Sequence, residues 1–379
     1  MGASGLASPR SGDPPQMKGA VFHGPGILRV EELPVGRPGP GEALLRTRAV
    51  GICGSDVHGY TGRSGRRVPP LVMGHEAVGE IVEFGPAQQA HEQGIRPGVL
   101  VAVNPLWSCG NCSACRAGAP HLCLHRKGLG MMTVAGAMAE YFLAPVTNLV
   151  PLPKGISAAV GALAEPLAVG LHAWAMLARS GRHPPAAPFK VAIIGAGMIG
   201  VTILAAMPAD LQRDVVVCDV RADRLDRVKT LVPSAAVENS GQTAWEDIRR
   251  RHAPEGFDAV FEAVGLGTTA AASIELARPG GTVVWVGNAE PDVTVSMQRV
   301  VTAEVTIAGS YAYTPEEFRQ TVDRLPTLSW LPGVVDAVLP LRAAPAAFAD
   351  LATAQAHALK VILDPALESA DDKRGSAAP

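Results

Sequence analysis

The sequence predicts an α/β protein of two domains, one rich in β-strands and one built on a doubly wound parallel sheet. Three observations support this fold class. The chain has 379 residues, which is more than one hydrophobic core usually supports. Short β-like runs separated by Gly and Pro clusters fill residues 17–150. Between residues 190 and 310, apolar β-like runs alternate with helix-like segments, which is typical of βαβ units around a buried parallel sheet.

The expected domain boundaries lie where these patterns change. Both ends of the chain are rich in small and polar residues, and we expect them to be disordered. A helical stretch at 157–180 precedes the breaker-rich segment GRHPPAAP at 181–188, which could end one part of the first domain. The expected parts are a disordered N-terminus at 1–16, a β-rich domain at 17–160 and 311–367, a parallel-sheet domain at 161–310 and a disordered tail at 368–379.

Composition and charge exclude several classes of function. Apolar residues make up 47% of the chain and charged residues 18%, which suits a compact globular protein. The formal net charge is −2 and no long basic run is present, so the electrostatic footprint of a nucleic-acid-binding protein is missing. The N-terminus has no apolar signal segment, and the longest apolar stretch is interrupted by Glu165, Pro166 and His172. We therefore expect a cytoplasmic protein with no nucleic-acid or membrane partner.

A cysteine-rich loop lies in the β-rich part of the chain. Four of the six cysteines fall within residues 108–123, spaced C-x₂-C-x₂-C-x₇-C. The alternatives are a disulfide knot, a nucleic-acid-binding zinc ribbon, a metal-pinned loop on an enzyme and four crowded thiols. A reducing compartment disfavours disulfides, and this spacing lets four thiolates surround one tetrahedral ion. Because four sulfurs close the coordination shell, we expect a structural zinc without a catalytic role, held by Cys109, Cys112, Cys115 and Cys123.

The parallel-sheet domain opens with KVAIIGAGMIG, an apolar strand followed by Gly195, Gly197 and Gly200 and then by an apolar helical run. This arrangement exposes backbone N–H groups and a helix N-terminus to the pyrophosphate of a dinucleotide. Asp219 ends the next apolar run, where its carboxylate can accept hydrogen bonds from the adenosine ribose, so NAD is predicted rather than NADP. Further residues assigned to this site are Met198, Ile199, Arg224, Val264 and Gly287.

Alternatives remain open at this site. Arg221 and Arg224 could instead bind the 2′-phosphate of NADP, although the neighbouring carboxylate would repel that phosphate. The segment could also be a tight turn with a surface Asp and no cofactor. Cys218, inside the preceding apolar run, is expected to be an inert buried thiol.

A second set of metal-binding residue types is spread along the chain, with Cys53 in CGSDVH, His75 and Glu76 in GHE, and Glu165 in AEPLAV. Each alone is a weak signal, because a single His or Glu usually has a structural role. Together with the four-cysteine loop and the glycine segment, they resemble the zinc-dependent medium-chain dehydrogenases, close to their sorbitol (polyol) and threonine dehydrogenase branch. The resemblance runs from about residue 17 to 365 and implies a GroES-like β-rich catalytic domain beside a Rossmann NAD-binding domain.

The resemblance implies a catalytic zinc, the second zinc of the chain, bound by Cys53 and His75. A carboxylate takes the remaining protein position in polyol-type relatives, and either Glu76 or Glu165 could supply it here. Three protein ligands leave one position open, where zinc lowers the pKa of bound water, and by the same logic of a bound alcohol, towards about 7. The implied reaction transfers a hydride between a secondary alcohol and NAD.

The resemblance also implies roles for residues beside these ligands. Ser55 and His58 match the positions of the proton relay, and Asp56 is expected to be a structural hydrogen-bond acceptor rather than a base. The plainer alternatives are a turn-stabilising hydroxyl at Ser55 and an exposed loop histidine at His58. Homodimers or homotetramers are the rule in such families, so we expect one of these assemblies.

One departure from the family pattern and one basic loop bear on the substrate. Where the sorbitol-handling branch has an Arg, this chain has Ala312, which argues against sorbitol itself. Arg63, Arg66 and Arg67 follow the relay segment and could bind the phosphate of a phosphorylated polyol, or form an exposed basic loop.

The predicted substrate is therefore a polyol, a sugar alcohol with or without a phosphate, or a cyclitol or aminocyclitol. A threonine-type amino alcohol is the alternative within the same chemistry. An NAD-sensing zinc-ribbon binding protein is the alternative of another class.

Overall fold

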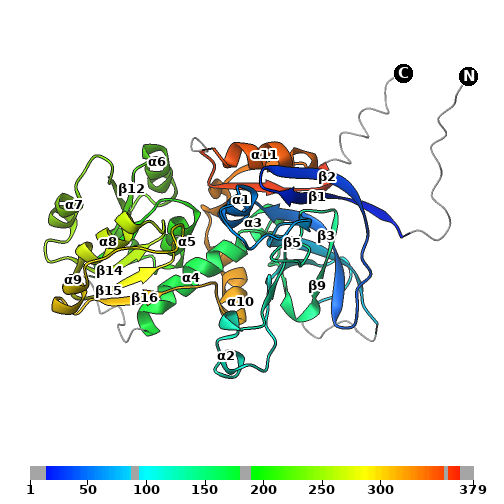
Figure 1. Cartoon of the computed structure of the whole chain (residues 1–379), viewed down its shortest axis with the longest axis horizontal. Helices are drawn as coiled ribbons and strands as arrows, with labels where there is room; N and C mark the ends of the chain where they lie inside the picture. Colours follow the sequence, from blue (N-terminus) through cyan, green and yellow to red (C-terminus); the bar gives the residue numbers. More distant parts are fainter. Residues whose placement is uncertain (1–13, 87–93, 180–188, 354–356, 368–379) are drawn as a thin grey trace, which may run out of the picture.

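The computed structural model describes residues 14–86, 94–179, 189–353 and 357–367. In Figure 1 a β-rich lobe lies on the right and a parallel-sheet lobe on the left, with helices α4 (Ala164–Arg179) and α10 (Pro315–Arg324) between them. The segments expected to be disordered at 1–13 and 368–379, and the connection at 181–188, lie outside the described residues. Gln16, expected in the disordered N-terminus, instead opens the first strand.

The β-rich lobe contains a seven-stranded and a three-stranded sheet. Its strands are β1 (Gln16–Gly24), β2 (Ile27–Pro34), β3 (Glu42–Gly51), β4 (Leu71–Val72), β5 (Glu76–Phe84), β6 (Leu100–Val103), β9 (Tyr141–Pro145), β10 (Leu149–Pro151), β17 (Val335–Leu339) and β18 (Lys360–Leu363). The larger sheet has the order β10-β6-β5-β3-β18-β17, with β9 also paired to β3, and the smaller one joins β2, β1 and β4. One core, which includes Phe22, Leu45 and Phe348, joins the two sheets. β18, the last strand among the described residues, therefore lies inside a sheet that the N-terminal half begins.

Three short helices cover this lobe, α1 (Gly54–Tyr60), α3 (Ala158–Gly161) and α11 (Ala344–Leu351). α11 packs over β2, and its Phe348 ring lies 5.5 Å from the ring of Tyr60 in α1. α1 begins two residues after β3 ends, so the sheet fixes where this helix starts.

The second lobe is built on six parallel strands. They are β11 (Val191–Ile194), β12 (Val215–Asp219), β13 (Ala236–Asn239), β14 (Phe257–Glu262), β15 (Ala277–Trp285) and β16 (Thr306–Gly309). Helices α5 (Met198–Ala206), α6 (Ala222–Leu231), α7 (Trp245–His252), α8 (Gly267–Leu276) and α9 (Met297–Thr302) connect them. The order β13-β12-β11-β14-β15-β16 reverses between β11 and β14, which confirms the predicted doubly wound sheet and sets a ligand crevice at that switch point.

Helices α4 and α10 link the two lobes. α4 packs against α5 and against α10, and Glu317 of α10 lies 2.9 Å from the ring of His172 in α4. The segment Ala158–Arg179 is long and apolar enough to cross a membrane by composition, but 67% of its most apolar window is buried inside the protein. That burial is typical of a core helix. Because these helices share a core with both lobes, the exact boundaries at 160/161 and 310/311 stay predictions.

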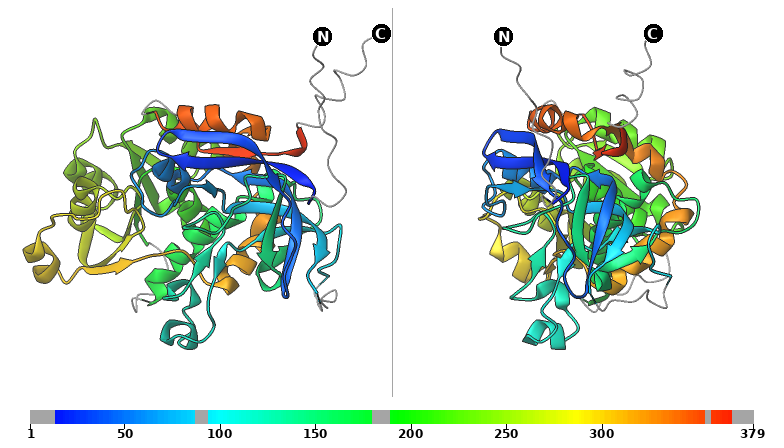
Figure 2. Two further views of the ribbon diagram at one scale, coloured as in Figure 1. Left: turned by 45° about the vertical axis from the view of Figure 1, so that its right-hand side comes forward. Right: turned by 90° about the vertical axis from the view of Figure 1, so that its right-hand side faces the viewer.

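The cysteine-rich loop forms a small projection, the cysteine lobe, at residues 106–128 (Figures 1 and 2). It contains β7 (Leu106–Trp107), α2 (Ser113–Arg116), the 3₁₀ turn η1 (Pro120–Leu122) and β8 (Lys127–Gly128). The buried ring of His121 lies 4.8 Å from the ring of His172, edge to face. This contact docks the cysteine lobe on α4.

Gly170 determines how closely α4 approaches α5. A Cβ at this position would lie 2.3 Å from the backbone carbonyl carbon of Thr202. We expect Gly170→Ala to lower the free energy of unfolding by roughly 1–3 kcal/mol, because overpacking forces the helices apart. Chemical denaturation measures this change. The control is Gly54→Ala, a helical position where a Cβ meets nothing within 4 Å, and equal destabilisation by both variants would contradict the packing argument.

Candidate active site

Three ligand atoms of metal-binding type meet at one end of the larger β-sheet. Cys53 follows β3, and Glu76 opens β5 opposite Gly51, the last residue of β3. His75 directly precedes Glu76. The ligand atoms of Cys53, His75 and Glu76 all lie within 4.8 Å of one another, with His75 and Glu76 buried. The pairing of β3 with β5 therefore brings two separate motifs into one cluster.

The start of α1 orients the Cys53 thiol. Cys53 is the N-cap residue, and its Sγ accepts hydrogen bonds from the backbone N–H and the hydroxyl of Ser55, at 3.4 and 3.3 Å. Asp56 completes a capping box by accepting the N–H of Cys53 at 3.3 Å. The CGSD motif is thus a helix start whose caps hold Sγ towards the cluster.

A buried ion pair supports His75. Asp56 Oδ1 accepts hydrogen bonds from Arg67 Nη2 and Nε, at 2.7 and 3.1 Å, and lies 3.5 Å from His75 Nδ1. Burial opposes ionisation of Asp56, but His75 and Arg67 outweigh it and hold the pKa of this carboxyl well below its ordinary value. Burial likewise opposes the charge on His75, yet Asp56 and Cys53 raise the pKa of His75 well above its ordinary value. Asp56 is thus a hydrogen-bond acceptor inside the protein.

The burial of Arg67 corrects one expectation drawn from the basic loop. Arg67 is 5% exposed, and its guanidinium also donates to Ser55 Oγ at 3.2 Å. A side chain that is buried and paired with Asp56 is not available to a substrate phosphate, so this part of the expectation was wrong. Arg63 and Arg66 are exposed.

Glu76 has a cationic partner that comes from the far end of the chain. Lys360 Nζ, at the start of β18, lies 2.7 and 2.6 Å from the two carboxylate oxygens of Glu76 and donates to the carbonyl of Ile52 at 3.3 Å. Burial opposes the charge on Lys360, but Glu76 and Cys53 raise the pKa of the lysine above its ordinary value. Glu76 is therefore paired with a buried lysine at the edge of the cluster.

Glu165, the other candidate carboxylate, opens α4 and faces the same region. Tyr313 is buried and its hydroxyl donates to Glu165 Oε1 at 2.9 Å. Loss of hydration raises the pKa of Glu165 to about 7, with His75 lowering it and Glu76 raising it. The mutually close ligand atoms found among the described residues do not include Glu165.

The residues of this cluster fit a zinc ion. A thiol, an imidazole and a carboxylate form the mixed S, N and O donor set that zinc takes at catalytic sites, where three protein ligands leave one position open. The buried Nδ1 of His75 makes no well-formed hydrogen bond, and its charged neighbour is Asp56 Oδ1 at 3.5 Å.

The cysteine lobe fits a second zinc ion. All six cysteines are described and none forms a disulfide. Pairs among Cys109, Cys112, Cys115 and Cys123 lie at Sγ–Sγ distances of 3.5, 3.5 and 4.0 Å. A tetrahedral ion with Zn–S bonds of about 2.3 Å needs edges of about 3.8 Å. Backbone N–H groups of Cys115 and Leu124 lower the pKa of Cys112 to about 6, which favours a thiolate ligand.

The glycine segment forms a cradle at the switch point of the parallel sheet. Gly195 has φ +104°, and a Cβ at Gly200 would lie 1.8 Å from the carbonyl oxygen of Gly195. Gly197 is the N-cap of α5 without a side-chain cap, and Met198 and Ile199 begin that helix, so its first N–H groups remain available. These features fit the pyrophosphate of a dinucleotide.

Residues from the neighbouring strands complete this cradle. A Cβ at Gly195 would lie 2.8 Å from Val264, and one at Gly287 would lie 2.2 Å from the N–H of Gly265. Buried Glu262, at the end of β14, accepts the N–H groups of Val264 and Gly265 at 2.9 and 2.8 Å. Glu262 was not predicted from the sequence, because an acidic residue ending a strand carries no distinctive local signal.

Asp219 lies beside the glycine turn at the end of β12. Its oxygens accept the N–H groups of Ala196 and Arg221, at 2.8 and 2.9 Å. Arg224 Nη1 lies 3.8 Å from the same carboxylate, whereas the Arg221 guanidinium is engaged by Asp223 at 2.7 Å. Cys218, as expected, is buried, and burial raises its pKa. The Arg221–Asp223 pair weakens the case for a 2′-phosphate site at Arg221.

Ser55 and His58 both lie on α1 and are both exposed. Burial of part of the ring lowers the pKa of His58, and the charge of Arg63 adds to this shift. A neutral imidazole can accept a proton, so the position suits the predicted relay.

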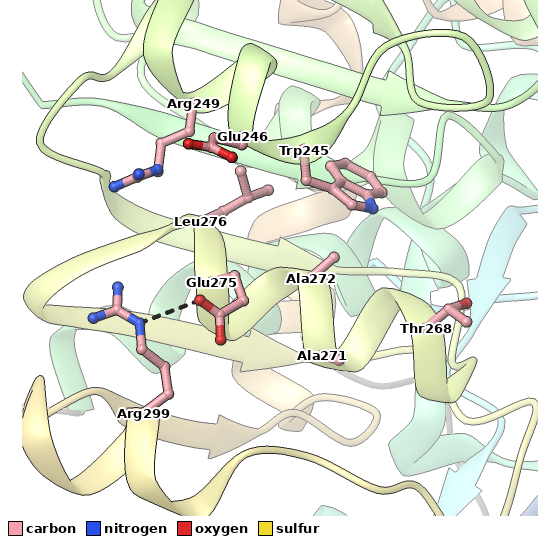
Figure 3. A pocket seen from close by; sticks show the side chains of 9 residues that line it. All are labelled: Trp245, Glu246, Arg249, Thr268, Ala271, Ala272, Glu275, Leu276 and Arg299. Carbon is pink, nitrogen blue, oxygen red and sulfur yellow. Dashed lines mark ion pairs between the residues drawn. The ribbon is translucent and has the colours of Figure 1, made fainter.

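A hollow of about 670 Å³ lies elsewhere, on the outer side of the parallel-sheet lobe between α7, α8 and α9. Figure 3 shows Trp245 and Arg249 on one side and Glu275 paired with Arg299 on the other. None of the predicted site residues lines it.

Comparison with known proteins identifies the family. Residues 39–154 match the family described as "Alcohol dehydrogenase GroES-like domain", and residues 195–327 match "Zinc-binding dehydrogenase". Sorbitol dehydrogenase of Bacillus subtilis is 32% identical over 304 residues, 79% of this chain and 83% of that protein. L-galactonate-5-dehydrogenase of Escherichia coli is 32% identical, covering 77% of this chain and 82% of that protein.

Solved structures agree with this assignment. A zinc-binding dehydrogenase of Sinorhizobium meliloti bound to NADP is 28% identical with a TM-score of 0.81, covering 93% of this chain and 100% of that one. An E. coli alcohol dehydrogenase complexed with NADH is 25% identical with a TM-score of 0.81, covering 92% and 99%. Galactitol-1-phosphate dehydrogenase of E. coli is 25% identical with a TM-score of 0.80, covering 92% and 100%. The predicted resemblance and fold class are confirmed.

The two metal clusters are expected to respond differently to mutation. Cys112→Ser should reduce bound zinc from about two to about one per chain and lower the thermal unfolding temperature, because the cysteine lobe has little core of its own. Cys53→Ser should also remove about one zinc but abolish turnover while the chain stays folded. Metal analysis, thermal unfolding and NADH formation separate these outcomes. Equal loss of folding in both variants would contradict the division between structural and catalytic zinc.

Proposed function

Because this chain belongs to the zinc-dependent medium-chain dehydrogenases, in their sorbitol dehydrogenase-like branch, we propose that it oxidises a secondary hydroxyl of a polyol, sugar alcohol or cyclitol with NAD. The chain is an oxidoreductase of CH–OH groups, and zinc and a nicotinamide dinucleotide are its cofactors. One observation carries the substrate proposal. The residues beside Cys53 and His75 are two carboxylates, Glu76 and Glu165, rather than a further cysteine.

In this proposal Cys53, His75 and Glu76 would hold the catalytic zinc, and Glu165 is the neighbouring carboxylate. When bound, zinc supplies a positive charge that favours the deprotonated substrate hydroxyl, and the nicotinamide supplies a hydride acceptor. Asp56 fixes the ring of His75, because it is itself fixed by Arg67. Lys360 competes for both oxygens of Glu76. Glu165 can therefore share or take over the carboxylate position as the site changes state.

Ser55 and His58 are proposed to carry the proton of the substrate hydroxyl to solvent. Ser55 Oγ lies next to Cys53 Sγ at 3.3 Å, and His58 follows one turn later on α1. The lowered pKa of His58 keeps its ring neutral near neutral pH, so a ring nitrogen can accept the proton. Both side chains are exposed, as a path to solvent requires.

The dinucleotide is proposed to bind at Gly195, Gly197, Met198, Ile199, Gly200, Val264 and Gly287, with Asp219 and Arg224 near its ribose. Asp219 supports NAD over NADP, because a second negative charge beside this carboxylate would be repelled. Arg221 is engaged by Asp223, so only Arg224 remains to favour a 2′-phosphate.

The names of the relatives bear on the substrate. The curated relatives are named for sorbitol and L-galactonate, and one solved relative for galactitol 1-phosphate, so neutral and anionic sugar alcohols are both within range. A threonine-type amino alcohol remains the alternative in the same chemistry. The family assignment leaves little support for an NAD-sensing zinc-ribbon protein.

We propose a cytoplasmic homodimer or homotetramer without nucleic-acid or membrane partners. β16 is an edge strand of the parallel sheet, and Met297 and Val301 are 77% and 66% exposed one turn apart on the neighbouring α9. An unpaired strand beside an apolar surface suits pairing with a second copy. Light scattering tests this assembly, and a stable monomer would contradict it.

The test of the proposed function is NADH formation at 340 nm with a panel of polyols, cyclitols, their phosphates and threonine. We expect turnover of one class of polyol-like alcohol, with about two zincs per chain and NAD preferred over NADP by at least about tenfold, as the carboxylate at Asp219 requires. Removal of zinc by a chelator should abolish turnover, and its return should restore it. Turnover of threonine alone would replace the polyol proposal by the amino-alcohol alternative.

A further inference from the structure

Two arginines from different parts of the chain lie over one aromatic ring. The guanidinium carbons of Arg66 and Arg126 lie 5.8 and 5.0 Å from the centre of the Tyr311 ring. Arg126 Nη2 also donates to the Tyr311 hydroxyl at 3.3 Å. Cation–π contacts of this kind hold a guanidinium in place while leaving its edge free to donate hydrogen bonds. The Tyr311 ring therefore holds two positive charges close together.

Two of the three segments that meet here also reach the catalytic cluster, and the third is joined to one of those two. Arg66 precedes Arg67, whose guanidinium donates to Ser55. Tyr311 lies two residues before Tyr313, whose hydroxyl donates to Glu165. The segment that follows Arg126 is joined to the loop of Arg66 by two backbone hydrogen bonds, from Met132 to Arg66 and from Val68 to Met132, at 2.8 and 3.2 Å. The arginine pair therefore lies on segments that are directly connected to residues of the site.

The charges of this pair are not neutralised within the described part of the chain. Neither Arg66 nor Arg126 forms an ion pair with a carboxylate of the described residues, and both are exposed. The sequence has no Asp or Glu between residues 57 and 75 or between 97 and 139. The two segments that carry Arg66 and Arg126 therefore contain basic residues but no acidic ones. The guanidinium of Arg66 has no hydrogen-bond partner among these residues, and Arg126 uses donors only for Cys123 O and Tyr311.

A structural role in balancing the cysteine thiolates would account for Arg126 but not for Arg66. Arg126 Nη1 donates to the carbonyl of Cys123 at 3.1 Å. Arg116, also on the cysteine lobe, donates to the carbonyl of Asn111 and has no contact with Tyr311. Arg66 belongs to the loop after α1 and contacts no cysteine, so its approach to the same ring needs another explanation.

We propose that Arg66 and Arg126 bind an oxyanion, a carboxylate or a phosphate, carried by the substrate at the end remote from the reacting hydroxyl. The substrate class is therefore an anionic sugar alcohol, either an aldonate or a polyol phosphate. This proposal rests on the proposed dehydrogenase function and narrows its substrate. Guanidinium groups bind both kinds of oxyanion through paired charge-assisted hydrogen bonds. Because Tyr311 holds the two guanidinium groups in place before the substrate binds, less entropy is lost on binding.

The test compares kcat/KM for glucitol, gluconate and glucitol 6-phosphate with the zinc-loaded enzyme and NAD. We expect one anion to exceed glucitol by at least about tenfold, and which anion does so distinguishes carboxylate from phosphate. Arg66→Gln and Arg126→Gln should each lower the anion-to-neutral ratio of kcat/KM roughly tenfold, the loss of one charge-assisted contact. Arg116→Gln, which removes a charge from the same lobe, is the control and should leave the ratio unchanged. Thermal unfolding verifies that each variant is folded.

The outcomes separate this inference from the proposed function. Turnover of glucitol with no preference for an anion, or a ratio equally affected by Arg116→Gln, overturns the oxyanion site but leaves the dehydrogenase. If no alcohol is oxidised, the proposed function fails. The oxyanion site is then tested separately, by calorimetry of gluconate and of inorganic phosphate binding to the NADH-loaded protein. Binding that Arg66→Gln and Arg126→Gln weaken, but Arg116→Gln does not, supports it, whereas absence of binding overturns it.

Discussion

The site depends on the neutralisation of carboxylates that the fold removes from water. Asp56 and Glu76 are 0% and 1% exposed, and an unpaired charge at that depth would cost several kcal/mol. Arg67 pairs with Asp56 and Lys360 with Glu76, each within 2.7 Å. Glu165 has a neutral donor instead, the hydroxyl of Tyr313. Because each carboxylate has its own donor, the protein can hold three acids beside Cys53 and His75 without losing their geometry.

α4 joins this electrostatic arrangement to the rest of the molecule. Its first turn carries Glu165, and two turns later His172 contacts both His121 of the cysteine lobe and Glu317 of α10. Between Glu165 and His172 on the same helix, Gly170 allows the close approach to α5, the helix whose first turn forms the dinucleotide cradle. One buried helix therefore fixes the carboxylate, the cysteine lobe and the nucleotide-binding lobe relative to one another.

Much of the site could be predicted from the sequence because its signals are local. The glycine turn, the CGSD helix cap and the cysteine spacing each lie within one short stretch of the sequence, so their chemistry is visible locally. Lys360 lies 284 positions from Glu76, and Tyr313 lies 148 from Glu165, and neither belongs to a motif. The burial of Arg67 was not predicted, because nothing in the sequence distinguishes it from the neighbouring arginines of the same loop. Pairings made by the tertiary structure were therefore beyond the sequence.

The place of β18 in the larger sheet has a consequence for how the protein is made. This strand lies between β3 and β17, and it is the last strand in the described part of the chain. During synthesis, β3 can pair with β5 and β9 early, but Val50 and Gly51 at its end have no partner on one side until β18 has been translated. Glu76 also lacks Lys360 during that time, so its burial is unfavourable. The nucleotide-binding lobe is complete earlier in translation, so the lobe begun first is the one finished last, and translation of β18 sets when the zinc site can close.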